Sequence, residues 1–340
     1  MTIQNEKPGE ATASQLGGQQ GSGASIKGRS LWSDARRRLW RDKAAMVCLA
    51  IIALYALVAI AATVYDFAAE HSDGLKTFQE MANYDRAYRG PQLPSTESWG
   101  AFWRSVPDVL GTDWSGRSVL VKTLLGAKVS MTVGLMANII AVPLGMLLGA
   151  IAGYYGRWSD NVIVWLYSTL ASIPGIILLI AMKFAFKDVT VMGMDLSGIK
   201  GVYIALAVVS WIGTCRLVRA EVMKLRELDY VLAAKATGRR GPAILVRHII
   251  PNVMHIGIIN FSLGFVGAVQ AEVILSYLGL GVDVGTPSWG VMINSARMDL
   301  FAGRWWELTA AVVAIFLLVL ALNIFGDRLR DALDPRLKNV

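Results

Sequence analysis

The chain has 340 residues, of which 54% are hydrophobic and 17% are charged, and its net charge at pH 7 is +8. Because an average soluble domain carries about a quarter charged residues, this composition excludes an ordinary soluble protein and predicts an all-α integral membrane protein. The basic residues cluster beside apolar runs and form no basic soluble domain with aromatic residues, so we expect no nucleic-acid partner.

The first 127 residues divide into four segments. Residues 1–30 are rich in Gly, Ser, Gln and Thr, which predicts a disordered cytoplasmic tail, and residues 31–43 form a basic cytoplasmic segment. Residues 44–65 are an uncharged apolar run that is long enough to cross the bilayer. This run and the polar stretch before it are too long for a cleaved signal peptide, so we expect a retained transmembrane anchor. Residues 66–127 are polar and are predicted to be extracytoplasmic.

Residues 128–327 contain five further apolar runs, which predict a core of five transmembrane helices and a total of six. These runs are Val129–Tyr155, Val162–Phe186, Gly201–Val218, Ile256–Leu280 and Leu308–Phe325. Lys and Arg are most numerous in the loop between the fourth and fifth spans and in the final segment, residues 328–340. The positive-inside rule therefore predicts that both termini are cytoplasmic. Pro143 and Pro174 lie within the second and third spans and are expected to kink them.

Two features inside the spans are candidates for a structural or a functional role. Gly145, Gly149 and Gly153 recur every four residues along the second span, which predicts a closely packed helix neighbour. Glu272 lies near Gln270 in the fifth span, and an ionisable group there is expected to face protein or a water-filled path. A structural hydrogen bond and a role in the path or its gate are equally compatible with these residues. The spans carry no chain of Asp, Glu and His, which weighs against a proton-driven carrier.

The loop between the fourth and fifth spans, residues 220–255, is polar and basic. Residues 228–237 are good helix formers, and four of them share one face of mainly small side chains: Tyr230, Ala233, Ala234 and Thr237. Gly238 is expected to stop this helix, Pro242 to begin the next one, and Pro251 to end it. The predicted elbow also carries Arg239, Arg240 and Arg247. A helix that docks in a groove of another protein and a loop that rests on anionic lipid head groups are equally compatible with this pattern.

The sequence lacks the signatures of several enzyme classes. It contains no P-loop of the form G-x-x-x-x-G-K-[ST], no G-x-S-x-G and no H-E-x-x-H. Its three histidines are scattered, and Cys48 and Cys215 lie in or beside apolar runs. We therefore expect no catalytic residues, no cofactor, no metal and no ATP site in this chain. A secondary transporter or channel subunit is the main alternative to a transport subunit that is powered by a partner, and a polytopic membrane enzyme is a further one.

The basic loop contains the pattern Ala233-Ala234-x-x-x-Gly238, followed after nine residues by His248-x-Ile250-Pro251. This pattern resembles the EAA loop of ABC-importer permeases, and its flanking residues resemble the peptide-importer branch. Further motifs of that branch are matched outside the loop, by Leu110–Leu120, Gly126–Ser130, Leu275–Gly281, Pro287–Gly290 and Gly326–Pro335. The chain departs from the pattern at Leu232, where the family often has Glu, and at Thr237, where Leu is usual.

The resemblance implies a type I ABC-importer permease fold in a bacterial inner membrane and a role as the permease subunit for peptides or peptide-like solutes. The implied protein partners are a second homologous permease subunit, two cytoplasmic ABC ATPase subunits or domains, and an extracytoplasmic solute-binding protein. The lipid bilayer is a further partner, in which the permease subunits are embedded. The loop 228–251 would couple to the ATPases. The motifs outside the membrane would contact the binding protein or gate the outer mouth, through Asp113, Arg117, Pro287 and Trp289.

Overall fold

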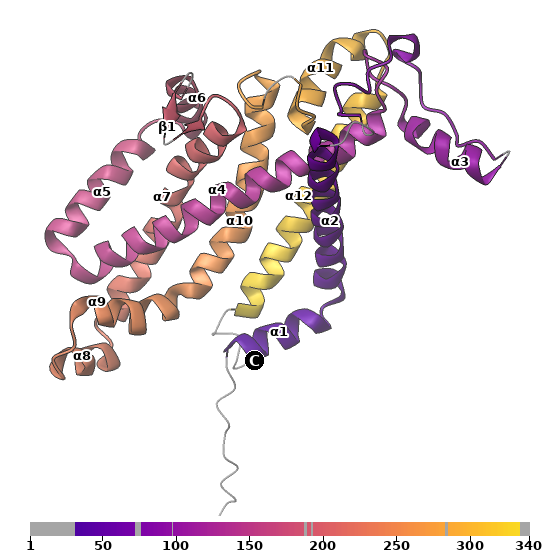
Figure 1. Cartoon of the computed structure of the whole chain (residues 1–340). Coiled ribbons are helices and arrows are strands. Elements are labelled where there is room, and N and C mark those ends of the chain that lie inside the picture. The colour runs from indigo at the N-terminus through magenta and orange to yellow at the C-terminus, as the bar shows by residue number, and fades with distance from the viewer. Residues whose placement is uncertain are drawn as a thin grey trace, which may run out of the picture.

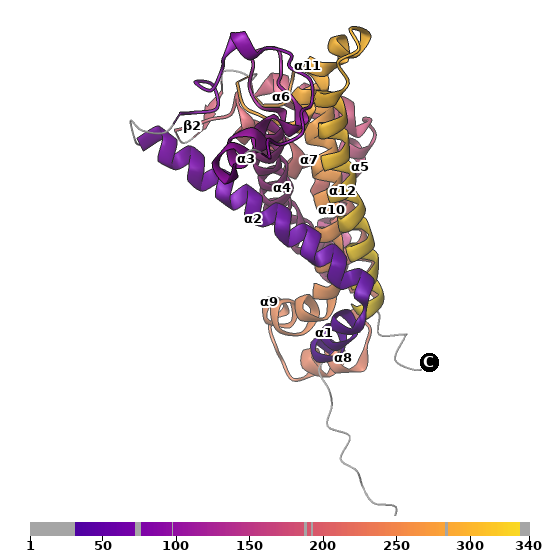
Figure 2. The same ribbon diagram turned by 90° about the vertical axis from the view of Figure 1, so that its right-hand side faces the viewer.

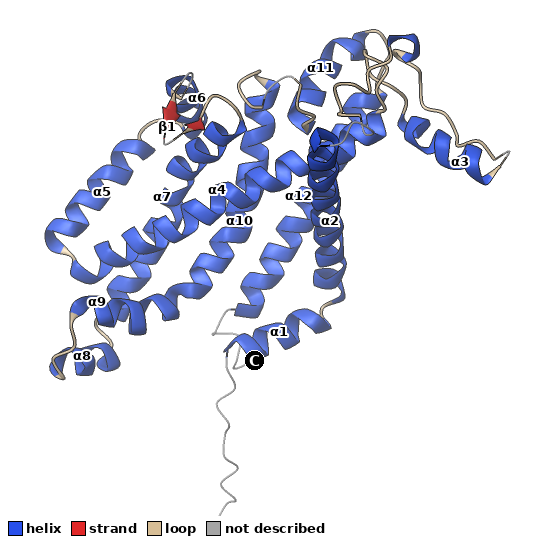
Figure 3. Cartoon of the chain, in the orientation of Figure 1, coloured by secondary structure: helices blue, strands red, loops and turns tan. Residues whose placement is uncertain are grey.

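The computed structural model describes residues 31–71, 76–96, 98–186, 189–191, 193–282 and 285–333. Most of these residues are helical, as Figure 3 shows; their strands are β1 (Thr190–Val191) and β2 (Met194–Asp195), which pair antiparallel in a short hairpin. The predicted disordered tail, residues 1–30, and the last seven residues, 334–340, lie outside the described residues.

Five helices of the described chain are long and apolar enough to cross a membrane. They are α2 (Lys43–His71), α4 (Val119–Tyr155), α7 (Ile199–Leu225), α10 (Ile250–Tyr277) and α12 (Trp306–Leu333). The shorter helices are α1 (Leu31–Arg41), α3 (Trp99–Ser105), α5 (Arg157–Ala171), α6 (Gly175–Ala185), α8 (Asp229–Ala236), α9 (Gly241–Ile244) and α11 (Trp289–Phe301). Single 3₁₀ turns cover Tyr84–Arg86 and Val106–Leu110.

The predicted third span is not one continuous helix. It consists of α5 and α6, which are bent by 92° at the break between them and together count as a sixth candidate span only if the pair is one broken span. Pro174 is the N-cap of α6 and has no N–H with which to continue α5. By contrast, α4 runs through Pro143 without interruption. The same residue type therefore breaks one apolar run and not the other.

Two helix ends also differ from the predicted ones. Helix α4 begins ten residues before Val129, because the Ser118 side chain accepts a hydrogen bond from the N–H of Val121 (3.2 Å) and caps a helix start there. Helix α12 continues to Leu333, so the first part of the segment 328–340 is helical. Apolar composition predicts where a chain can sit in lipid, whereas capping decides where its helix starts.

The close neighbour predicted for the second span is α7. A Cβ atom added to Gly145 would lie 2.6 Å from the carbonyl oxygen of Trp211, and one added to Gly149 would lie 2.6 Å from that of Cys215. At Gly153 the distance to the carbonyl oxygen of Arg219 would be 2.8 Å. Since real Cβ atoms do not approach oxygen so closely, α4 and α7 can pack in this way only with glycine at these positions.

The helices define two ends of the molecule (Figures 1 and 2). Helices α1, α8 and α9 lie at one end, which we call the elbow end. Helices α3, α6 and α11 lie at the other, which we call the loop end. The core between them is formed mainly by α4, α7, α10 and α12, whose buried side chains fall into clusters shared by these helices.

Candidate functional site

The elbow consists of α8, a tight turn and α9. Gly238 ends α8 as predicted: its φ is +76°, a left-handed conformation that favours glycine, and a Cβ there would meet nothing within 4 Å. The N–H of Gly238 donates to the carbonyl of Lys235 (3.0 Å), and the N–H of Arg239 donates to that of Ala234 (3.2 Å). Pro242 then lies in the first turn of α9, where no donor is required.

One side of α8 is anchored in the core of the molecule. Val231 and Ala234 are buried in a cluster with residues of α9 and α10 and with residues of the membrane helices, including Ala150 of α4 and Val222 of α7. Ala234 therefore does not belong to an exposed docking face, and the prediction was wrong for this residue. Helix periodicity placed Ala234 on the same face as Tyr230 and Ala233. In the structure Ala234 faces the core, whereas Ala233, the residue before it, is exposed.

The opposite side of α8 is open. Tyr230 is 41% exposed and Leu232 is 43% exposed, and Ala233 and Thr237 are exposed as well. Arg239, Arg240 and Arg247 are exposed beside this face. The elbow thus presents apolar and small side chains with a basic rim, while its inner side is fixed to the helices that cross the membrane. Leu232, the departure from the family pattern, adds apolar surface where an acidic residue is usual.

Pro251 does not end the second helix of the elbow. The backbone from Leu245 to Ile249 forms a π-helical turn, and the N–H of Ile250 bonds to the carbonyl of Leu245. Pro251 then falls in the first turn of α10, and the helical path from Gly241 to Tyr277 is continuous. Proline is tolerated in the first turn of a helix, and short π turns occur inside longer helices. The second helix of the elbow therefore continues directly into α10.

Polar contacts also connect the elbow to its neighbours. The amide of Asn252 in α10 donates to the Tyr230 hydroxyl (3.3 Å), and the Lys235 ammonium lies 5.4 Å from the ring centre of Tyr154 in α4. The Arg226 guanidinium, just after α7, donates to the carbonyl of Gly153 in α4 (3.0 Å). These contacts and the shared buried cluster attach the elbow to α4, α7 and α10.

Gln270 and Glu272 lie on different sides of α10. The exposed side of this helix is a stripe at spacings of three and four residues: Leu263, Gly267, Gln270, Ile274 and Tyr277. Beside it, Gly213, Leu217 and Ala220 of α7 are exposed, and both helices line a cavity of about 450 Å³. We call this surface the open face. Glu272 is instead fully buried and accepts hydrogen bonds from the hydroxyls of Ser130 (3.1 Å) and Ser276 (2.7 Å). For Glu272 the structure supports the structural alternative, and Gln270 keeps its candidacy for the path.

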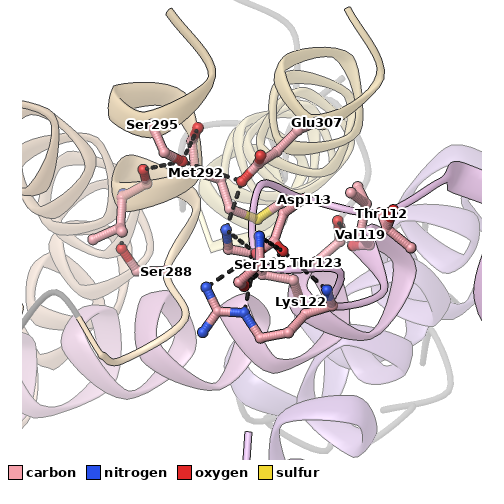
Figure 4. A network of polar contacts seen from close by, with 12 residues as sticks. Thr112, Asp113, Ser115, Val119, Lys122, Thr123, Ser288, Met292, Ser295 and Glu307 are labelled. Carbon is pink, nitrogen blue, oxygen red and sulfur yellow. Dashed lines mark hydrogen bonds and ion pairs between the residues drawn. The ribbon is translucent and has the colours of Figure 1, made fainter. Parts of the chain in front are cut away.

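At the loop end the structure brings together a largely buried charge cluster of Asp113, Arg117, Lys122 and Glu307, and Figure 4 labels all of these except Arg117. The Lys122 ammonium lies 3.0 Å from Asp113 and 2.6 Å from Glu307, and the Arg117 guanidinium lies 3.0 Å from Asp113. The Ser295 hydroxyl of α11 also donates to Glu307 (3.1 Å). The cluster thus joins the loop before α4 to α4, α11 and α12.

Asp113 is held in its ionised form by this arrangement. Burial by itself raises the pKa of this carboxyl, but the neighbouring Lys122 and Arg117 cations and the hydrogen bonds from Ser115 and the Arg117 backbone more than offset it. The net result is a pKa below the ordinary value for aspartate. Two cations and two carboxylates balance each other, which allows all four groups to be placed in or beside the protein interior.

This burial corrects the predicted contact surface at the loop end. Asp113 is 1% exposed and Trp289 is 0% exposed, so neither can touch a partner protein in this conformation. The Trp289 indole N–H donates to the carbonyl of Thr123 (2.9 Å), and its ring packs on Gly126, where a Cβ would clash with it. Asp113 and Trp289 therefore have structural roles. Pro287 is half-buried, so part of it is accessible to a partner.

Lys122 and Glu307 were not singled out in the sequence. The available signal was modest: each is an isolated charge in the first turn of an apolar helix, where a lone charge needs a partner. Their pairing could not be read from the chain, because 185 residues separate them.

Comparison with known proteins gives a consistent assignment. Residues 145–339 match the family described as "Binding-protein-dependent transport system inner membrane component", and residues 30–84 match the N-terminal TM domain of oligopeptide transport permease C. The dipeptide transport system permease protein DppC of Alkalihalophilus pseudofirmus is 36% identical over 310 residues, which cover 91% of each chain. The glutathione transport system permease protein GsiD of Pectobacterium atrosepticum is 33% identical over 92% of this chain and 93% of its own.

A solved chain of the MetNI methionine ABC transporter, in an inward-facing conformation, aligns with 64% of this chain and 96% of its own, at 18% identity and a TM-score of 0.47. The family match covers more than half of the present chain, and the relatives exceed 30% identity over nearly its whole length. This chain therefore belongs to the family of binding-protein-dependent transport system inner membrane components.

Proposed function

We propose that this chain is the permease subunit of an ATP-driven importer of peptides or peptide-like solutes. Support for the transport role comes from the family, and support for the substrate class comes from relatives that are named for dipeptides and for glutathione. The family assignment sets aside a secondary transporter, a channel subunit and a membrane enzyme. ATP would be hydrolysed by two partner ATPase subunits or domains, because the sequence carries no P-loop.

The observation that carries the proposal is the two-sided build of α8. Its exposed side has the small and apolar residues that suit a groove on another protein, and its buried side packs against α4, α7, α9 and α10. A partner that grips the exposed side and changes shape would therefore move three membrane helices at once. Such a device couples two separate sites through one mechanical element, which is what ATP-driven transport requires.

The remaining partners are assigned to the other surfaces. We expect the second, homologous permease subunit to face the open face of α7 and α10, with Gln270 directed towards the path between the subunits. The solute-binding protein would approach the loop end, and Pro287 and the exposed part of Arg117 keep their candidacy for that contact. The elbow end carries α1 and the basic loop, so both termini would lie in the cytoplasm by the positive-inside rule.

The proposal is tested with Ala233→Trp, placed on the exposed side of α8. As a matched control, Ala61→Trp introduces the same side chain at an exposed position of α2, far along the chain from the elbow. The subunits encoded with this chain are co-expressed, and two quantities are measured: the amount of ATPase that co-purifies, and vanadate-sensitive peptide uptake in proteoliposomes. We expect both quantities to fall at least tenfold in Ala233→Trp and to stay unchanged in Ala61→Trp.

Normal ATPase co-purification and uptake in Ala233→Trp would remove the docking role of α8. Uptake by the wild-type complex that is insensitive to vanadate and follows a proton gradient would instead refute the ATP-driven mechanism itself.

A further inference from the structure

A deep apolar groove lies between α2, α4, α10 and α12. Its volume is about 520 Å³, and the residues at its elbow end include Met254 and Ile258 of α10 and Phe325 and Leu329 of α12. Its few polar side chains include Asn138, which is buried and already donates to the carbonyl of Gly134 (2.8 Å). A peptide or other polar solute would find almost no hydrogen-bond partners here, so the groove is not suited to the transported substrate.

The extent of the groove matches one leaflet of a bilayer. On α10 it runs over the twelve residues from Met254 to Phe265, and the eleven steps between them, at a rise of 1.5 Å each, span roughly 16 Å. Half of the roughly 30 Å hydrocarbon core is about 15 Å. A helix about 10 Å across fills roughly 120 Å³ per residue, so the groove volume equals only about four residues of a helix. A single acyl chain is therefore the better occupant.

A set of exposed cations lies on α1 and at the start of α2, next to the end of α12 that lines this groove. Helix α1 lies below the lower end of α12 in Figure 1, and Asp42, just after α1, forms an ion pair with Arg328 of α12 (3.4 Å). Arg328 directly precedes Leu329, which lines the groove. Around this junction the exposed basic residues include Arg36, Arg37, Arg41 and Lys43, which we call the basic corner. Within the part of the chain that the structure describes, these four side chains have no carboxylate in ion-pair distance.

The exposed aromatic residue of α1 supports a position at the lipid surface. Trp40 is 67% exposed and lies among the arginines of the helix. Tryptophan and arginine side by side on a short helix that leads into a membrane span are typical of an interfacial helix, in which the ring enters the head-group layer and the cations meet lipid phosphate.

We propose that this subunit holds one anionic phospholipid, with an acyl chain in the apolar groove and the phosphate on the basic corner. The apolar wall alone would accept any lipid, and the cations alone would attract any anion. Their adjacency selects a molecule that carries both a long apolar chain and a net negative head group. The site is separate from the elbow and from the open face, so it does not depend on the proposed peptide specificity.

The test uses the complete importer complex, purified in detergent and stripped of lipid. Phosphatidylglycerol or phosphatidylethanolamine is then added back, and the lipid retained per complex is counted by native mass spectrometry. We expect phosphatidylglycerol to be retained preferentially. Because each cation near the phosphate contributes about fivefold in affinity, the triple variant R37Q/R41Q/K43Q should bind it roughly 100-fold more weakly. Ile258→Trp, which fills the groove, should abolish retention of both lipids.

Two matched controls define the result. The triple variant K76Q/K200Q/R297Q removes three exposed cations at other sites, and Leu320→Trp adds a tryptophan to an exposed part of α12 outside the groove. Both should retain phosphatidylglycerol as the wild type does. Equal retention of the two lipids, or unchanged retention in Ile258→Trp, would overturn the proposal.

A second measurement uses a photoreactive lipid. Phosphatidylglycerol with a photoreactive group on its acyl chain should label residues of α10 and α12 that line the groove in the wild-type complex. Labelling confined to other helices, or a cross-link from Ile258→Cys to the second permease subunit in place of lipid, would overturn the assignment of the groove.

Discussion

Replacing Lys122 by Met is the most direct test of the buried charge cluster. The side chains of Lys122 and Glu307 are only 4% and 3% exposed, and that of Asp113 is fully buried. The variant leaves two carboxylates beside each other with Arg117 as the remaining cation. Breaking a buried ion pair by removing one partner costs about 3–5 kcal/mol, since the other charge stays desolvated and unpaired.

The chain offers a matched control on the same helix. Lys128 is paired with Asp66 at 2.6 Å, but these side chains are 31% and 30% exposed, so Lys128→Met should cost at most about 1 kcal/mol. The assay is thermal unfolding of the purified complex in detergent, with both variants measured side by side. The double variant Lys122→Met/Glu307→Gln should regain part of the lost stability, because it removes the charge of Glu307, which Lys122→Met leaves without its ion-pair partner. If Lys122→Met is no more destabilised than Lys128→Met, the cluster does not hold the loop end together.

Three further predictions concern single positions. Gly149→Ala should destabilise the complex by about 1–3 kcal/mol in thermal unfolding, because its Cβ would lie 2.6 Å from the Cys215 carbonyl oxygen. The control is Gly213→Ala, whose Cβ would have nothing within 4 Å; this variant should be neutral or slightly stabilising. Gly238→Ala should cost about 1 kcal/mol through its φ of +76° alone, and Gly238→Asn, which tolerates that conformation, should cost less; equal losses would point to a packing cause. Because the pKa of Asp113 is lowered on folding, its charge stabilises the protein above the unfolded pKa of about 3.9, and this contribution is lost as the pH falls through the folded value. Unfolding midpoints measured from pH 6 to pH 3 should therefore fall more steeply for wild type than for Asp113→Asn, and parallel curves would contradict the depressed pKa.

Several of these arguments could be made from the sequence because they depend on local chemistry. Apolar runs must lie in lipid or a core whatever the rest of the chain does, so they indicated the long helices α2, α4, α7, α10 and α12. A glycine every fourth residue exposes helix backbone along one side, which predicted the close approach that α4 and α7 make. Gly238 and Pro242 fix backbone angles by their own covalent structure, and the elbow turns where they predicted.

The features that the sequence left open, or indicated wrongly, depend on contacts between distant segments. Periodicity places Ala234 on the same side of α8 as Ala233, and only the packing of α8 on α4 and α7 shows which side faces the core. Pro143 and Pro174 are the same residue in similar apolar runs, yet one lies within a continuous helix and the other begins a new one at a 92° bend. Asp113 and Trp289 were predicted to be exposed contact residues. Asp113 is instead buried beside Lys122 and Glu307, which are 185 residues apart in the chain. Trp289 is buried against Gly126. A charge or a ring has the same chemistry anywhere in the chain, and its burial is decided by what folds over it.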